Sequence, residues 1–188
     1  MRFDRQRADY DEALGWVAAL MGQTGANQLD DETPCAEFSV RELMGHVLGT
    51  ARRSLGTAEG SPARDVPHVV ADVPDEDLAA TFAGLAQRIG SAWSGREARQ
   101  SVTAPWGPCT AIEAVQGFTV ETVVHGWDLA VATGQPQEAV APVAERCLAF
   151  AHEVVPRRLR GVMHDEPIRP DVAIPPTERL ANLLGHHR

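Results

Sequence analysis

The sequence predicts an all-α fold, a bundle of four long helices followed by a proline-rich C-terminal extension. Apolar residues recur at helical spacing through four long segments, residues typical of helix starts and stops bound these segments, and strand patterns are almost absent. Helices of this kind pack their apolar stripes into one shared core. Because 188 residues are enough for one sizeable core and few for two, we expect a single domain over residues 1–188.

The first two helices are marked by their boundary residues. The first is expected over about 4–21, where Gly22 ends the apolar pattern. The second begins at Ser39, and Glu42 three residues later completes the pattern of a capping box, in which side chains and backbone groups satisfy each other at a helix start. The proline-rich segment 60–73 that follows is expected to be a loop.

Two further helices and a tail complete the predicted fold. The third helix is expected to begin at about Pro74, because acidic residues suited to a first turn follow this proline. Residues 100–110 are interpreted as a short extended piece around a turn. The fourth helix, about 110–132, is the longest and most apolar, and a glycine follows its end. A fifth is expected over 142–159, and the tail, 165–188, contains a proline-rich crossing of the bundle and one short helix.

Composition excludes several classes of function. The formal net charge is −9 and no basic run exceeds two residues, so phosphate backbones would repel the chain and no nucleic-acid partner is expected. No apolar stretch approaches the roughly 20 residues that span a bilayer, and the N-terminus mixes charges of both signs, unlike a signal peptide. We therefore expect no membrane partner and a cytoplasmic location. All 17 basic residues are arginine, which excludes lysine Schiff-base chemistry.

The three cysteines, Cys35, Cys109 and Cys147, are far apart in the sequence and form no Cys-x-x-Cys pair. An odd number of cysteines in a chain expected to be cytosolic argues against a disulfide framework. A zinc site with thiolate ligands usually shows cysteines at ligand spacing, which is missing here. We therefore expect no disulfide among the three and no cysteine among the primary metal ligands.

Two histidines and one glutamate are the strongest candidates for a functional site. His46 lies among apolar residues of the second helix, while Glu121 and His125 lie on one face of the fourth, roughly 6 Å apart along its axis. An unpaired buried carboxylate is costly, so Glu121 needs a cation, a hydrogen-bond donor or a metal. Two imidazoles and a carboxylate suit zinc and leave one position open for water or substrate. A non-haem iron site uses the same residue types.

Other interpretations of these residues stay open at the level of the sequence. A lone histidine on an apolar stripe is more often a hydrogen-bonded core residue, and an isolated glutamate four residues before a histidine also occurs by chance or as an ion pair. Asp128, three residues beyond His125, is placed either to orient a ligand or to act as a cap or surface residue. The remaining histidines are weaker candidates because they lie in predicted loops, near a helix end or in the tail: His68, His164, His152, His186 and His187.

A resemblance to a known family is carried by three stretches, "TPCAEFSVRELMGHVLGT", "ETVVHGWDLAVATG" and "RPDVAIPPTERLANLLGHHR". Together they resemble the actinobacterial metal-binding branch of the DinB-like superfamily, which includes the N-terminal domain of mycothiol-dependent maleylpyruvate isomerase. The resemblance implies a DinB-like four-helix bundle that binds a divalent metal, zinc being expected. In that branch the ligands are a histidine on the second helix and a glutamate and a histidine four residues apart on a later one. These positions fall on His46, Glu121 and His125.

The resemblance also implies a function. It suggests a thiol-dependent transferase or isomerase, in which the metal activates mycothiol or another low-molecular-weight thiol for an electrophilic substrate. The isomerase has an additional C-terminal domain for which 188 residues leave no room, so its specific reaction is not implied. A non-catalytic metal-binding or stress-response module and a metal-dependent hydrolase are the alternatives. Monomer and homodimer both stay open.

Overall fold

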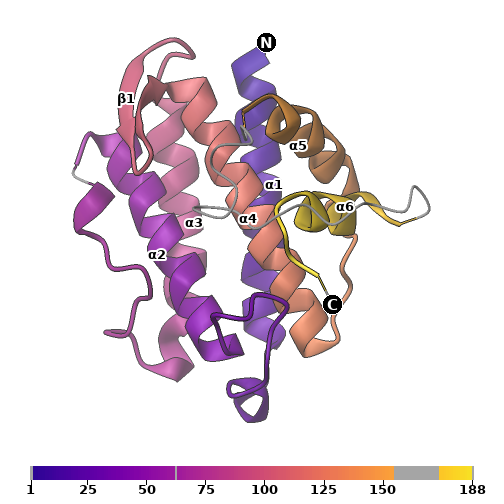
Figure 1. Ribbon diagram of the computed structural model, residues 1–188. Helices are drawn as coiled ribbons and strands as arrows, with labels where there is room; N and C mark the ends of the chain where they lie inside the picture. Colours follow the sequence, from indigo (N-terminus) through magenta and orange to yellow (C-terminus); the bar gives the residue numbers. More distant parts are fainter. Residues whose placement is uncertain (1, 62, 155–173, 188) are drawn as a thin grey trace.

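The structure is a computed structural model that describes residues 2–61, 63–154 and 174–187. It confirms the predicted all-α fold (Figure 1). Four long helices form the bundle: α1 (Arg2–Gln23), α2 (Val40–Glu59), α3 (Leu78–Ser94) and α4 (Ala111–Thr133). Two further helices, α5 (Ala141–Val154) and α6 (Pro176–Leu183), pack against each other and against α4.

The two helices that carry the candidate ligands begin and end at chemically defined residues. At the start of α2 the backbone N–H of Ser39 donates to the Glu42 carboxylate at 2.9 Å, and the Ser39 hydroxyl accepts from the Glu42 N–H at 3.4 Å. Thr110 and Glu113 form the same capping box at the start of α4, and Gly134 ends this helix with a left-handed φ of 68°. These caps determine where each helix starts, and therefore which side chains share a face.

Helix α4 is the central element of the molecule. It packs against α2 on one side and against α5 and α6 on the other, and α1 runs behind it (Figure 1). Neighbours on both sides explain why α4 is apolar around most of its circumference rather than along a single stripe. Gly126 permits close packing against α1, because an added Cβ there would lie 2.6 Å from the Trp16 ring and 2.9 Å from the Val17 side chain.

The predicted loop 60–73 lies against α2 and shapes the surroundings of a candidate ligand. The Val70 N–H donates to the Gly45 carbonyl at 3.1 Å, and a Cβ on Gly45 would lie only 2.6 Å from the Val70 carbonyl oxygen. The missing side chain at Gly45 thus permits the loop backbone to approach the helix. As a result, His68 in the loop lies next to His46 on α2, with ring centroids 4.5 Å apart.

The remaining predictions for the second half of the chain have mixed outcomes. The extended piece is an antiparallel hairpin of β1 (Ser101–Ala104) and β2 (Gly107–Thr110). The predicted range of the fifth helix continues to 159, and its residues 155–159 lie outside the described residues. The predicted crossing of the bundle falls largely on 165–173, also outside them, whereas α6 is the short helix expected in the tail. Among the described helices, none has the length and apolar character needed to cross a membrane.

Candidate metal centre

His46 lies on the buried face of α2, and the adjacent loop orients its ring. Its Nδ1 lies 3.1 Å from the carbonyl oxygen of His68, and because a carbonyl only accepts hydrogen bonds, the proton is assigned to Nδ1. The other nitrogen, Nε2, is then an unprotonated acceptor. It is buried and has no hydrogen-bond partner within the described part of the chain. A buried acceptor without a donor is costly, and a metal ion would satisfy it.

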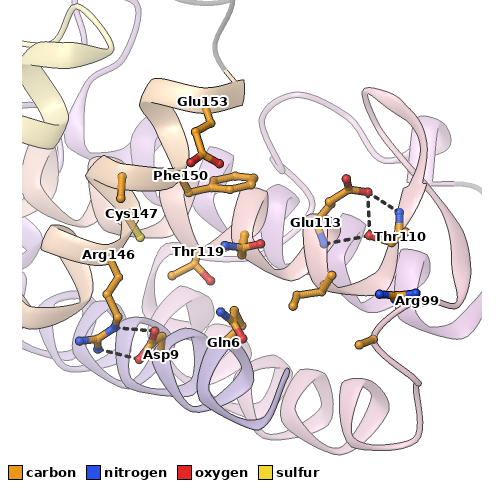
Figure 2. Close-up of a pocket in the computed structure, with 14 residues that line it drawn as sticks. Gln6, Asp9, Arg99, Thr110, Glu113, Thr119, Arg146, Cys147, Phe150 and Glu153 are labelled. Carbon is orange, nitrogen blue, oxygen red and sulfur yellow. Dashed lines mark hydrogen bonds and ion pairs between the residues drawn. The ribbon is translucent and has the colours of Figure 1, made fainter. Parts of the chain in front are cut away.

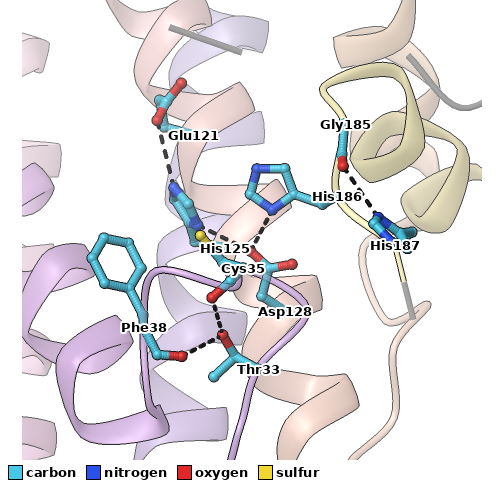
Figure 3. A network of polar contacts seen from close by, with 9 residues as sticks. All are labelled: Thr33, Cys35, Phe38, Glu121, His125, Asp128, Gly185, His186 and His187. Carbon is cyan, nitrogen blue, oxygen red and sulfur yellow. Dashed lines mark hydrogen bonds and ion pairs between the residues drawn. The ribbon is translucent and has the colours of Figure 1, made fainter. Parts of the chain in front are cut away.

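His125 and Glu121 lie on the face of α4 that looks toward α2. The Nδ1 of His125 is 3.1 Å from Asp128 Oδ2, and its Nε2 is 3.7 Å from Glu121 Oε2 (Figure 3). Asp128 is fully buried, whereas the Glu121 side chain is 32% exposed. The bond to Asp128 therefore fixes the His125 ring from the buried side and leaves Nε2 free to face Glu121.

The three residues singled out from the sequence meet between α2 and α4. His46, Glu121 and His125 each offer one ligand atom, and these atoms lie within 4.8 Å of one another among the described residues. The rings of His46 and His125 are 4.6 Å apart in an edge-to-face arrangement. The four-residue spacing holds two ligands on one face of α4, while helix packing brings in the third. Two imidazole nitrogens and a carboxylate oxygen are a donor set that fits zinc with an open position.

The surroundings shift the pKa values of the two imidazoles in opposite directions. Burial, helped by the nearby positive charges of His125 and His68, lowers the pKa of His46 to about 3, so this ring is neutral at neutral pH. For His125, burial also disfavours the charged form, but the hydrogen bond and charge of Asp128 and the charge of Glu121 outweigh it and raise its pKa. The raised pKa of His125 favours a proton on the ring that faces Glu121, and a bound metal ion would replace that proton.

Two supporting residues acquire roles that the sequence left open or missed. Asp128 is neither a helix cap nor a surface residue, because it is fully buried and accepts from His125. Its Oδ2 also accepts from Nδ1 of His186 at 2.8 Å. Burial raises the pKa of Asp128, but the hydrogen bonds from both histidines lower it by more. The net effect is a lowered pKa, so the carboxylate is ionised at neutral pH. The three-residue spacing of His125 and Asp128 was the available signal, whereas no sequence pattern connects His186 to this site.

An aromatic ring and a cation also lie near the ligands. Phe38 stacks on His46 with ring centroids 5.0 Å apart and covers it from the loop that precedes α2. Arg53, about two turns beyond His46 along α2, donates to the Pro67 carbonyl at 2.7 Å and so holds the loop. Burial lowers the pKa of Arg53, and the negative charge of Glu121 opposes this shift. A guanidinium thus lies within electrostatic reach of the carboxylate that is most exposed.

A cavity of about 980 Å³ lies elsewhere, between α1, α4 and α5 (Figure 2). Arg146 donates to both oxygens of Asp9 at 2.7 Å in its wall, and the buried thiol of Cys147, whose pKa burial raises to about 12, lines it as well. None of the three candidate metal ligands borders this cavity. Size alone therefore does not locate the chemistry, and the convergent ligands identify the site better.

Comparison with known proteins gives matches to one family. Residues 10–130, a range that contains all three candidate ligands, match the family described as the mycothiol maleylpyruvate isomerase N-terminal domain. Two uncharacterized proteins from two strains of Mycobacterium tuberculosis are each 32% identical over 181 residues, covering 94% of this chain and 94% of the relative.

Solved structures show the same fold. The crystal structure of the mycothiol-dependent maleylpyruvate isomerase superposes with a TM-score of 0.61 at 15% identity, covering 77% of this chain and 68% of that one. A point mutant of the isomerase superposes with a TM-score of 0.60 at 12% identity and the same coverage. At this level of identity the likeness is one of fold.

Proposed function

The chain belongs to the family of the mycothiol maleylpyruvate isomerase N-terminal domain, and from this we propose that it is a metal-dependent transferase or isomerase that uses a low-molecular-weight thiol of the mycothiol type. His46, Glu121 and His125 are the proposed metal ligands, and zinc is the proposed metal. The observation that carries the proposal is the orphaned Nε2 of His46. It is buried, it lacks a partner among the described residues, and it lies next to the two other donors.

The residues around the three donors support a metal rather than a purely structural contact. Both imidazoles have their Nδ1 atoms engaged, His46 by the His68 carbonyl and His125 by Asp128. This is how metal-ligating histidines are usually held, since the partner selects the tautomer that leaves Nε2 unprotonated. In a hydrogen-bonded core histidine both nitrogens would have partners, and Nε2 of His46 has none in the described chain.

A thiol is the substrate type that this site would activate. A zinc ion held by three protein ligands supplies a positive charge at an open position, where a coordinating thiol loses its proton at neutral pH. Glu121 is the most exposed of the three donors, so the approach of a small molecule is proposed on its side. Arg53 is placed near that approach, where its guanidinium would attract the polar or anionic parts of the thiol or of its electrophilic partner.

The test is a thiol titration of metal-loaded protein prepared without a polyhistidine tag. We expect mycothiol to bind the zinc-loaded protein and to release about one proton per thiol bound, because coordination deprotonates it. The S-methylated thiol should not bind. His46→Ala should abolish thiol binding, whereas His152→Ala, an exposed histidine on α5, should leave it unchanged.

The second arm of the test is turnover. Maleylpyruvate is the first electrophile to assay, because it is the substrate named for the isomerase relative. Stoichiometric zinc without any thiol affinity would contradict the proposal and support a non-catalytic metal-binding module instead. Binding of less than one equivalent of zinc would overturn the proposal, because the thiol chemistry depends on the metal.

A further inference from the structure

A second group of metal-binding side chains lies beside the first, and none of its members belongs to the proposed ligand set. Cys35 comes from the loop before α2, Asp128 from α4 and His186 from the turn after α6 (Figure 3). One ligand atom from each lies within 4.8 Å of the other two. Asp128 is fully buried, and the two others are half-buried. The sequence did not indicate this group, because its members come from three distant segments.

The buried carboxylate at the centre of the group is incompletely satisfied. Oδ2 of Asp128 accepts from His125 and His186, but Oδ1 is buried and has no hydrogen-bond partner in the part of the chain that is described. Leaving a buried acceptor of an ionised group unpaired costs about 1–3 kcal/mol or more. A carboxylate with one oxygen held by histidines and the other unpartnered can coordinate a cation without losing its contact to His125.

The backbone holds the two flanking residues in place. The Cys35 carbonyl accepts from the Phe38 N–H at 2.9 Å and lies 2.9 Å from the Thr33 hydroxyl, so the turn that carries the thiol is tied at both ends. His186 follows Gly185, whose left-handed φ of 97° ends α6, and the His186 N–H donates back to the Ala181 carbonyl at 3.0 Å. This is the Schellman arrangement, which turns the chain sharply at a helix end. Both side chains are thus presented to Asp128 by closed turns.

The cysteine spacing led us to expect no cysteine among the primary metal ligands, but the geometry of this group points the other way. We propose that Cys35, Asp128 and His186 form a second divalent-metal site, adjacent to the first and taking zinc or another thiophilic metal. A thiolate, a carboxylate and a neutral imidazole are the ligand types of zinc sites, and the sulfur selects against magnesium and calcium. On binding, the metal replaces the proton of the Cys35 thiol, which is released to solvent. The thiolate and the Asp128 carboxylate then neutralise the two positive charges of the ion.

The position of Asp128 links this site to the first. Its Oδ2 contacts the Nδ1 of His125, so the carboxylate that would bind the second metal also orients a proposed ligand of the first. Loading of the second site and orientation of His125 therefore depend on the same side chain. The second site stands on its own geometry and does not require that the protein bind a thiol substrate.

The test is a titration of the untagged, metal-free protein with Co²⁺, since a tag would add competing histidines. We expect two equivalents to bind, with a thiolate-to-cobalt charge-transfer absorption in the near ultraviolet. Cys35→Ser should lose this absorption and one equivalent, and His186→Ala should lose one equivalent. Cys109→Ser, which removes a half-buried thiol outside the group, should keep both.

A further variant separates the two sites. His46→Ala should lose the first equivalent and keep the thiolate absorption. A single equivalent without thiolate absorption in the wild-type protein would overturn the proposal. So would loss of the absorption in His46→Ala, because the thiol would then belong to the first metal. Circular dichroism of each variant verifies that the helices are retained, and agreement between Cys35→Ser and His186→Ala guards against a folding defect in either.

Discussion

Replacement of Asp128 by Asn tests whether the buried negative charge that contacts His125 supports the proposed zinc site. Asn has nearly the same shape as Asp, and its amide oxygen can still accept from His125 and His186, the two donors that Oδ2 now serves at 3.1 and 2.8 Å. The substitution therefore preserves the geometry and removes the negative charge. The variant is best made in a Cys35→Ser background, so that only the first metal is counted.

The expected magnitude follows from the one bond that reaches a metal ligand. A hydrogen bond to a charged group contributes about 1.5–3 kcal/mol and a neutral one about 0.5–1.5 kcal/mol, so loss of the charge costs about 1–1.5 kcal/mol at His125. Since about 1.4 kcal/mol corresponds to tenfold in an equilibrium constant, zinc affinity should fall about tenfold. This value lies at the lower end of the 10–100-fold range typical for such partners of ligating histidines.

The assay is competition for zinc with a chromogenic chelator at constant pH and ionic strength. Asp72→Asn is the matched control, because Asp72 is 71% exposed and its ion pair with Arg52 at 3.1 Å is of a kind that contributes little. The control should bind zinc like its parent. Equal affinity of the Asp128→Asn variant and the control would refute the supporting role of Asp128, provided that both variants retain the helical spectrum.

Three further outcomes are expected. His125→Ala should lose stoichiometric zinc binding in the Cys35→Ser background with little change in helical content, and retention of tight zinc would exclude His125 as a ligand. Gly126→Ala should lower the melting temperature, because its Cβ would lie 2.6 Å from the Trp16 ring, and overpacking of this kind costs about 1–3 kcal/mol; an unchanged melting temperature would show that α1 and α4 separate without cost. In the metal-free protein, burial lowers the pKa of His46 to about 3 in the folded state, against an ordinary value of 6.5 for an exposed histidine. Unfolding therefore takes up a proton between these two pH values, and the folded state loses stability as the pH falls through this window. Denaturant titrations at several pH values should show the wild type losing stability relative to His46→Gln on acidification, and parallel curves would contradict the burial of a neutral His46.

The sequence predicted those features of the molecule that depend on neighbouring residues. The capping box of Ser39 and Glu42 and the glycine after the fourth helix act within a few residues, so they can be recognised without knowing the rest of the fold. The same holds for Glu121 and His125, because the helical repeat alone places them on one face. His46 was a candidate because it lies among apolar residues of a predicted helix, and the resemblance to a family pattern then placed all three residues at ligand positions. The structure brings them together.

Only the tertiary structure decided how these side chains are held and what lies beside them. The carbonyl of His68 selects the His46 tautomer because the loop that carries it packs against α2 at Gly45. This packing could not be read from the sequence around His46. The sequence did not decide whether Asp128 is exposed or buried. In the structure α5 and α6 pack against α4, and Asp128 is buried. His186 reaches Asp128 because a turn at the end of α6 directs it inward. Local sequence determines which face a helix presents, but burial and contact between distant segments arise only when the helices pack.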